Sequence, residues 1–421
     1  MNSKKNKLPS ILITVLLFTF LFYSFGKEWF WQSTGSPYRL TLISLFLPPL
    51  MLLVMAAILQ AFKNNSLFGR LSFAAFLFFM CIAASIILPS PYKGRIGIDF
   101  YLMLFAVYIS ILLGYKIGYS SLSLDTLLYR SAAFLGLLGY FSFFYTLMPS
   151  TSGLVAYNIL SIGWPMRLIE MFSLFYFLHR FLYLKDRNIF SIICFIGALL
   201  ACILLFTKNI ILPVIVGILI YFVILLFWSE KQRRAAILFR IISSLLVIVF
   251  LFFVIDNLSK GSYSSKINEE FYGHIIKSEN ISKIDLETAT SSRTTLWKDI
   301  IPRFSYSPIF GNGFGQSIRI GVVGETIPLH NGFLDLLVSV GLLGFSIFLF
   351  AIIDWFKIVG NKRVFIHSNG YNLAILAYVI ATLAFNLGST SRLFYATSCF
   401  SFFLMALIYG YAKSLNRALI R

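Results

Sequence analysis

The sequence predicts an all-α integral membrane protein with about twelve transmembrane helices and one large external loop between the ninth and tenth helices. The first observation is composition, since 59% of the 421 residues are hydrophobic, 12% are charged, and the mean hydropathy is +0.85. The second is a succession of long apolar runs, each near the ~20 residues that cross ~30 Å of hydrocarbon. The third is that the chain contains a single long polar interval, about 258–331.

The apolar runs set the expected order of the elements. Spans are expected at residues 8–25, 40–62, 71–88, 100–119, 127–148, 165–184, 189–206, 209–228, 236–256, 332–356, 371–387 and 393–411. The chain therefore divides into helices one to nine (1–257), an external loop that carries the candidate site (258–331), and helices ten to twelve (332–421).

The net charge of +19 comes from Lys and Arg residues that gather in short segments between the spans. With a cytoplasmic N-terminus, twenty of them lie in cytoplasmic segments and seven in short external ones. This asymmetry follows the positive-inside rule, so both termini are expected in the cytoplasm and the long loop outside. The same explanation argues against a nucleic-acid partner. The first apolar run has no small-residue cleavage site after it, so we interpret it as a transmembrane helix rather than a removed signal peptide.

Cysteine and acidic residues give no indication of a metal or cofactor. All four cysteines lie inside apolar spans without ligand spacing, which argues against a zinc site or a disulfide framework. The loop has two acidic pairs, Glu269–Glu270 and Asp285 with Glu287, which are the candidates for metal binding. Isolated acidic pairs are common in solvated loops, and we expect no metal and no cofactor.

Two external cations outside the long loop are candidate substrate-binding residues. Lys208 lies in a tight turn between two apolar spans and places one positive charge at the outer membrane surface. It can contact an anionic lipid head group, or it can simply extend its ammonium to the interface. Arg392 lies in the short external segment between the last two spans.

The second half of the loop begins with a short helix that Ser291 or Ser292 can cap and that is expected to end near Pro302. Arg293 and Trp297 fall on one face of that helix, together with apolar side chains. A buried arginine needs an anionic partner. That partner is either a substrate or a protein group that ties the loop down.

Three glycines at alternate positions follow, Gly311, Gly313 and Gly315. They predict a tight turn with close backbone approach. Without a βαβ context they do not indicate a dinucleotide site.

His330 and Asn331 open the tenth span, with Asp335 one turn further on. The positive end of a helix dipole favours the neutral imidazole, which is the form that a general base requires. A helix N-terminus also attracts phosphate. The alternative is a histidine that only caps the helix at the interface.

The order of these motifs resembles the O-antigen polymerase and ligase superfamily. The resemblance rests on Ser292–Arg293–Thr294 with Trp297, Ser307–Pro308 with the glycine turn, His330–Asn331, and the Gly341–Leu342–Leu343–Gly344 run, all within about 291–345. It implies metal-independent, inverting glycosyl transfer at the outer face of the bacterial inner membrane, with Arg293 and His330 as functional residues. The implied donor is a glycan on undecaprenyl pyrophosphate, and the acceptor is a glycan or lipid-linked molecule.

One position departs from that resemblance. The family usually has an arginine in the turn between two spans where this chain has Thr207–Lys208–Asn209. Lysine keeps the charge but loses the bidentate fork of arginine, which weakens the expected pyrophosphate contact.

We predict a polymerase that joins lipid-linked repeat units into a surface polysaccharide, for which a chain-length regulator is a candidate partner besides the membrane lipids. A ligase that transfers the finished glycan to a lipid A core is the alternative within the superfamily. A polysaccharide or lipid-linked oligosaccharide transporter is the alternative of another class. Transporters tend to carry polar sites at mid-membrane and internal repeats, which are not apparent here.

Overall fold

The computed structural model describes residues 70–88, 90, 98–119, 124–147, 169–203, 208–258, 264, 300–313, 318–320, 325–327, 331–388 and 396–420. The helices and strands are α3 (Arg70–Ile87), α4 (Ile98–Tyr119), α5 (Leu124–Leu147), a helix over 169–179 continued by the π-helix η1 (Arg180–Leu184), α7 (Ile189–Ile203), α8 (Lys208–Trp228), α9 (Lys231–Leu258), α14 (Ile300–Tyr306), β1 (Ile318–Ile320), β2 (Glu325–Ile327), α15 (Gly332–Val359), α16 (Lys362–His367), α17 (Tyr371–Gly388) and α18 (Ala396–Ile420).

From 71–88 onward, each predicted span coincides with a described helix. Most of the bounds agree to within a few residues, but α9 begins at Lys231, before the predicted 236, and α18 continues to Ile420, past the predicted end at 411. The spans at 8–25 and 40–62 lie outside the described residues. Within the described part, α15 is long and apolar enough to cross a membrane. Shorter apolar helical stretches are Phe73–Ser85, Val107–Tyr119, Ile189–Cys202, Leu212–Trp228 and Tyr371–Leu387. The helical prediction is confirmed, and the number of twelve spans stays a prediction.

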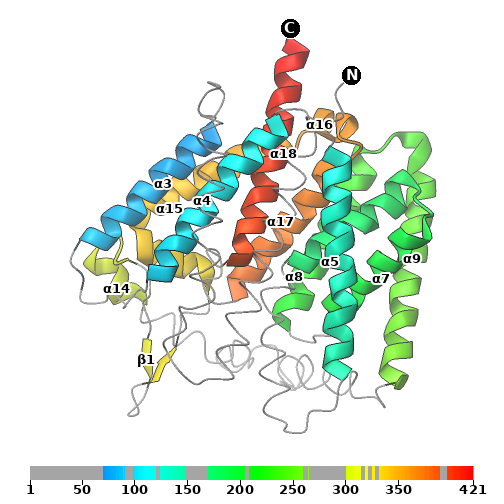
Figure 1. Cartoon of the computed structure of the whole chain (residues 1–421), viewed down its shortest axis with the longest axis horizontal. Helices are drawn as coiled ribbons and strands as arrows, with labels where there is room; N and C mark the ends of the chain where they lie inside the picture. Colours follow the sequence, from blue (N-terminus) through cyan, green and yellow to red (C-terminus); the bar gives the residue numbers. More distant parts are fainter. Residues whose placement is uncertain are drawn as a thin grey trace, which may run out of the picture.

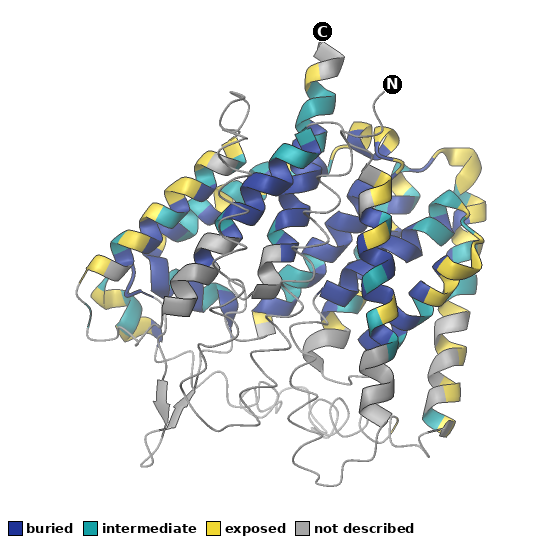
Figure 2. Ribbon diagram, viewed as in Figure 1, coloured by how far each residue is buried: buried dark blue, intermediate teal, exposed yellow. Residues whose placement is uncertain are grey.

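The outermost helices carry apolar side chains on their exposed faces. In α9, Phe239 is 72% exposed and Phe250 is 66% exposed, and α3 exposes Phe73 and Met80 in the same way. Figure 2 shows these faces in yellow around an interior of buried helices, among them α17. Such faces suit contact with lipid tails rather than water.

Helices pack in four close pairs, α4 with α18, α5 with α7, α8 with α17, and α3 with α15 (Figure 1). In the first pair, Gly114 and Gly118 lie one turn apart on α4, directly against the backbone of α18 at Phe403 and Leu407. A side chain at either glycine would collide with that backbone. Small residues four apart allow this close approach of membrane helices.

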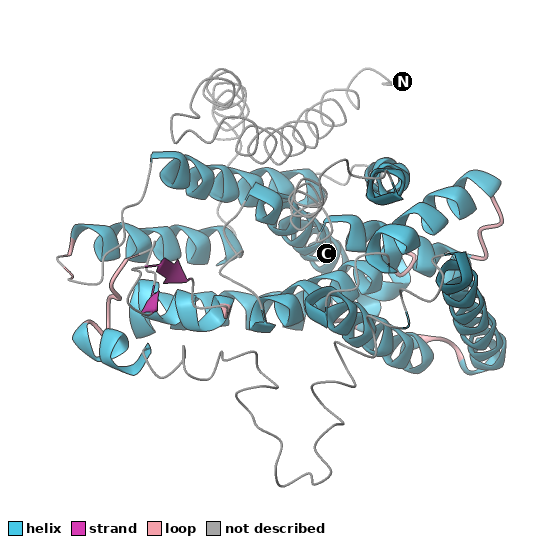
Figure 3. Ribbon diagram, turned by 90° about the horizontal axis from the view of Figure 1, so that it is seen from below, coloured by secondary structure: helices cyan, strands magenta, loops and turns pink. Residues whose placement is uncertain are grey.

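A short antiparallel hairpin interrupts the helical fold in the loop before α15. Strand β1 pairs with β2 in the register Ile318 with Ile327 and Ile320 with Glu325. Figure 3, seen from below, shows this strand pair against the surrounding helices. The hairpin lies inside the predicted external loop, and the other described elements are helices, so the all-α prediction holds for the fold. The hairpin itself was not predicted, because a pair of three-residue strands leaves little periodicity in the sequence.

The helix ends fall on two opposite faces of the molecule. The C-terminus and α16 lie at the upper edge of Figure 1, and α14 and β1 lie at the lower edge. Exposed cations lie on the upper side, in the turn between η1 and α7 and in the first turns of α9 and α16: Lys185, Arg187, Lys231, Arg233, Lys362 and Arg363. We call these the upper face and the lower face.

A polar cluster at the upper face ties four helical segments together. Tyr371 at the start of α17 donates to the Asp125 carboxylate of α5, which also accepts from Tyr176 at 3.2 Å. Arg180 lies 3.4 Å from the same carboxylate and donates from Nε to Asp186 at 2.6 Å. These bonds fix α17 against the helix over 169–179.

Opposing effects act on the pKa of Asp186, which lies in the turn before α7. Burial raises the pKa of its carboxyl. Hydrogen bonds from the Asn188 N–H, the Ser191 hydroxyl and Arg180 outweigh burial, so the net pKa lies below the ordinary value of 3.8. The carboxylate form is therefore the one that the fold stabilises.

Candidate functional site

The predicted site residues divide between described and undescribed positions. The structure describes Gly311, Gly313 and Asn331 fully, and the backbone of Lys208. Arg293, Trp297, Gly315, His330 and Arg392 lie outside the described residues, as do both acidic pairs of the loop. Within the described residues no group of three His, Cys, Asp or Glu could hold a metal ion.

Helix α15 is broken at Gly341, whose φ of 67° and ψ of −175° are not helical. In an unbroken helix the carbonyl groups of Val338 and Ser339 would accept from residues four further on. Instead, they accept from the glycine turn. The Asn312 N–H donates to Val338 and the Gly313 N–H donates to Ser339, both at 2.9 Å.

The two N–H groups released by the break find partners in the same turn. Leu342 donates to the Pro308 carbonyl at 2.8 Å, and Leu343 donates to the Ile309 carbonyl at 3.1 Å. Two helical bonds are thus exchanged for four bonds between the glycine turn and α15. Such pairing is what allows non-helical backbone at membrane depth. We call residues 308–313 together with 338–343 the interlock.

Two glycines make this approach of backbones possible. A Cβ atom at Gly311 would lie 2.5 Å from the Gly341 nitrogen, and one at Gly341 would lie 2.6 Å from the Gly311 nitrogen. Gly311 and Gly313 also have positive φ, 78° and 80°. The predicted tight turn with close backbone approach is confirmed for these two glycines. A role of theirs in substrate binding is not tested by this geometry.

Asn312, between the two glycines, was not predicted as a site residue. It is fully buried, and its side-chain amide donates to the Arg303 carbonyl of α14 at 2.6 Å. Its side-chain oxygen accepts from the hydroxyl of Ser90, just beyond α3, at 2.8 Å. Asn312 therefore joins α14, α3 and the interlock.

Helix α14 continues to Tyr306, past Pro302, where we expected a helix to end. The prediction of that end was wrong. A proline lacks only its own N–H and is tolerated in a first helical turn. Residues 291–299, with Arg293 and Trp297, lie outside the described residues.

Asn331 is the N-cap of α15. Its side-chain oxygen accepts from the N–H groups of Phe333 and Leu334, both at 3.1 Å, and its carbonyl accepts from Asp335. Capping of this kind satisfies N–H groups that a helix start leaves without partners. The side-chain oxygen of Asn331 is thus committed to the helix, and His330 is the residue directly before this fixed cap.

A buried amide faces the start of α15 from α17. Asn386 is 1% exposed, and its oxygen lies 3.0 Å from the position that a Cβ of Gly332 would occupy. Its amide nitrogen donates to the Thr382 carbonyl at 2.8 Å, but its oxygen has no hydrogen-bond partner among the described residues. Sequence reasoning missed Asn386, because one asparagine inside an apolar span carries no motif.

Lys208 is the first residue of α8, whose start lies at the lower face (Figure 1). The lower face is also where α14 and the hairpin lie. The backbone of Lys208 is therefore on the same side of the molecule as the loop. Thr207, before it, lies outside the described residues.

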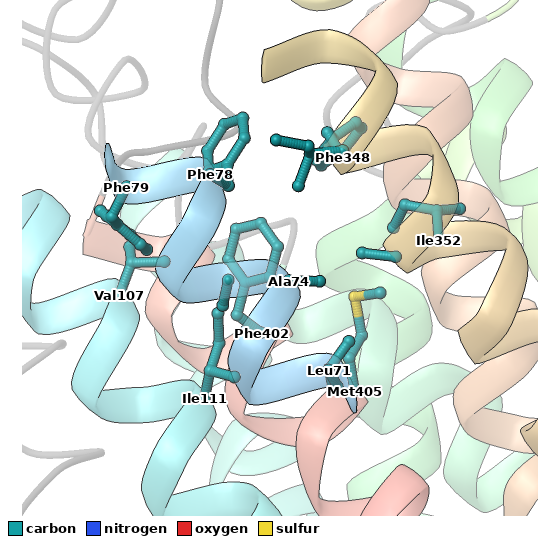
Figure 4. A pocket seen from close by; sticks show the side chains of 13 residues that line it. Leu71, Ala74, Phe78, Phe79, Val107, Ile111, Phe348, Ile352, Phe402 and Met405 are labelled. Carbon is teal, nitrogen blue, oxygen red and sulfur yellow. The ribbon is translucent and has the colours of Figure 1, made fainter. Parts of the chain in front are cut away.

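A cavity of about 50 Å³ lies among α3, α4, α15 and α18. Figure 4 shows that apolar side chains surround it, among them Phe78, Ile111, Phe348 and Met405. A glycan or a pyrophosphate needs hydrogen-bond partners and charges, which this cavity does not offer. The interlock and the start of α15 are the better candidate site.

Comparison with known protein families identifies this region. Residues 192–349 match the family described as O-antigen ligase. The predicted relationship to the O-antigen polymerase and ligase superfamily is confirmed. Members of the family are integral membrane enzymes, glycosyltransferase-like ligases and polymerases that use lipid-linked glycans. The matched segment runs from α7 to the second half of α15 and includes Lys208, Arg293, the interlock and His330. A search of curated proteins found no match.

Proposed function

We propose that this protein is a polysaccharide polymerase that joins oligosaccharide repeat units carried on undecaprenyl pyrophosphate. The observation that supports the proposal most is the family match over 192–349, which encloses the predicted arginine, glycine and histidine motifs. The described geometry adds that four backbone bonds tie the glycine turn to residues 338–343 of α15, the helix whose start follows His330 in the sequence.

The proposed reaction is direct displacement at the anomeric carbon of the donor sugar. A hydroxyl oxygen of the acceptor sugar forms the new C–O bond, and the bond to pyrophosphate breaks with inversion. His330 accepts the proton of the hydroxyl as general base. The cation of Arg293, with that of Lys208, stabilises the negative charge that grows on the leaving undecaprenyl pyrophosphate.

The fixed cap at Asn331 supports this role for His330. Helix α15 has a defined start, with N–H groups bound by the Asn331 side chain, and His330 is one residue away. The positive end of the helix keeps a nearby imidazole neutral. The interlock lies nine residues into α15, about 14 Å along its axis at 1.5 Å per residue. It ties the loop to α15 at this distance from the start of the helix.

We further propose that the lower face is periplasmic and the upper face cytoplasmic. The exposed cations at the upper face support this orientation, since such residues accumulate in cytoplasmic segments. It places the loop with Arg293 and His330 at the outer face of the inner membrane, where a lipid-linked glycan would be joined.

A ligase is the second candidate, and the description of the matched family as O-antigen ligase favours it. The two activities share the donor and the displacement chemistry. They differ in the acceptor, which is a lipid-linked glycan for the polymerase and a lipid A core for the ligase.

The test is an in vitro assay with purified protein, EDTA, and lipid-linked repeat units isolated from the host strain after deletion of this gene. A ladder of lengthened lipid-linked products supports the polymerase. Transfer only after addition of a lipid A core supports the ligase instead. Absence of product under both conditions contradicts the proposed function and leaves the transporter alternative.

Two variants test the residue roles in that assay. His330→Ala is expected to abolish turnover while the protein still inserts and binds the lipid-linked donor. His367→Ala is the matched control, because His367 is exposed on α16 at the upper face. Arg293→Lys is expected to reduce turnover because the bidentate fork is lost. Normal turnover of the His330 variant would refute its assignment as general base.

A further inference from the structure

The contact between the C-terminal part of α17 and the start of α15 contains a polar group that the proposed mechanism does not use. Asn386 is almost fully buried, and its side-chain oxygen has no hydrogen-bond partner among the described residues. A buried acceptor without a partner is unfavourable and uncommon in folded proteins. This one lies directly beside Gly332, the first residue of a 28-residue helix.

The hydrogen bond of the side-chain nitrogen fixes the orientation of the Asn386 amide. Its nitrogen donates to the Thr382 carbonyl at 2.8 Å, one turn earlier in the same helix. A flipped amide would set two carbonyl oxygens against each other and lose that bond. Asn386 therefore presents an acceptor, not a donor, toward the start of α15.

Because residue 332 is a glycine, it places no side chain against this buried acceptor. A Cβ there would lie 3.0 Å from the Asn386 oxygen and 3.3 Å from its Cβ. Gly332, Asp335 and Ser339 recur at helical spacing and share one face of α15. Asp335 and Ser339 are both buried, and the Ser339 hydroxyl has no hydrogen-bond partner among the described residues either. A polar strip thus runs from the helix start to the interlock.

An acceptor in this position selects the chemistry of its ligand. The pyrophosphate diester of the proposed donor is fully ionised at neutral pH, so it carries only acceptors and would be repelled by the amide oxygen. A sugar hydroxyl can donate to that oxygen. We propose that Asn386 is a substrate-binding residue whose side-chain oxygen accepts a hydrogen bond from a hydroxyl of the sugar held at the start of α15.

The assignment of a sugar rests on the proposed function, in which His330, next to the cap of α15, acts on a sugar hydroxyl. In this proposal the two parts of the donor are bound by different residues. The cations bind the pyrophosphate, and the Asn386 oxygen binds the glycan. Neither Asn386 nor Thr382 lies in the matched segment 192–349, so the proposal adds a residue from outside it.

The test compares two buried asparagines of α17. Asn386→Leu removes the unpartnered acceptor. Asn372→Leu is the matched control, because the Asn372 amide is buried and fully used, donating to the Val359 carbonyl at 2.7 Å and accepting from Ser368 at 3.2 Å. Both variants are purified as full chains, and their melting temperatures are measured with and without lipid-linked repeat units from the deletion strain.

We expect the two variants to behave in opposite ways. Without substrate, Asn386→Leu melts at or above the wild-type temperature, and Asn372→Leu melts below it. With substrate, wild type and Asn372→Leu gain thermal stability, whereas Asn386→Leu gains much less. In the polymerisation assay, Asn386→Leu raises KM about tenfold, as expected for one lost hydrogen bond of about 1.4 kcal/mol. Gly332→Ala, which crowds the acceptor, raises KM in the same direction.

Two results would overturn the proposal. One is a substrate-free melting temperature of Asn386→Leu that falls as far as that of Asn372→Leu, which would make the amide structural. The other is an unchanged KM and an unchanged stabilisation by substrate. A wild-type protein that binds the lipid-linked repeat but forms no product contradicts the proposed function instead, and the binding comparison still decides the role of Asn386.

Discussion

Replacing Gly341 by alanine is expected to open the interlock and destabilise the whole loop region. The backbone at Gly341, with φ of 67° and ψ of −175°, lies in a region that is essentially restricted to glycine. The new methyl group would also collide with the backbone of Ile309. Neither problem can be relieved by a side-chain rotation, because the atoms on both sides belong to the main chain.

The magnitude follows from the strain and the bonds at risk. Forcing a non-glycine residue into such a conformation costs about 1–3 kcal/mol. The four backbone bonds of the interlock contribute a net of about 1 kcal/mol each, and at least two of them must break to admit the methyl group. We therefore expect a loss of about 3 kcal/mol or more, which for a chain of 421 residues corresponds to a fall in melting temperature of roughly 3 °C or more.

The assay is thermal unfolding of the detergent-solubilised protein, followed by size-exclusion chromatography of a fluorescent fusion. Leu343→Ala is the matched control, because its side chain is 44% exposed and its backbone bond to Ile309 is kept. The control should melt close to wild type. A Gly341→Ala protein that melts at the wild-type temperature and keeps full polymerisation activity would refute the interlock as a structural requirement.

Further predictions concern three polar side chains. Asn312→Ala removes both side-chain bonds of a buried amide and is expected to lower the free energy of unfolding by about 2–3 kcal/mol, measured by the same melting assay. Asn331→Ala should cost about 0.5–2 kcal/mol as a lost helix cap, while Asn331→Asp keeps the cap. A loss of activity in a stable Asn331→Asp protein would then indicate substrate contact. The lowered pKa of Asp186 contributes stability that is fully present above its ordinary pKa of 3.8 and is lost as the pH falls through the lower folded value. The difference in melting temperature between wild type and Asp186→Asn should therefore shrink only in strong acid, and a difference that shrinks near neutral pH would contradict this.

The helical architecture could be predicted from sequence because hydrophobicity alone determines where a chain can cross a membrane. The described bounds of α15 and α17 agree with the predicted spans at their starts, at Gly332 and Tyr371. The hairpin and the end of α14 could not be predicted in this way. Each depends on contacts with distant segments, such as the bond from Asn312 to Arg303, and local periodicity does not record such contacts.

The candidate site was predictable only where a residue type has a strong local meaning. The glycines at 311 and 313 indicated a tight turn, and Asn331 stood where a helix cap belongs. That the turn would fill a break at Gly341 was not visible, because either glycine run alone is compatible with many turns. Asn386 gave no indication in sequence, since only its partner-free oxygen in the folded protein distinguishes it. The roles of Arg293 and His330 stay predictions that the proposed assays test.

The interlock also has a consequence for the order in which the protein is assembled. The two segments of the interlock are only about thirty residues apart in the chain. Ser90, which donates a hydrogen bond to the Asn312 side chain, precedes both segments. Contacts of short sequence separation form early in folding. The loop can therefore be fastened as soon as α15 enters the membrane, before α17 and α18 have left the ribosome. Helices α17 and α18 then pack last, against helices that are already in place. The contact of Asn386 with the start of α15 is therefore among the last to form.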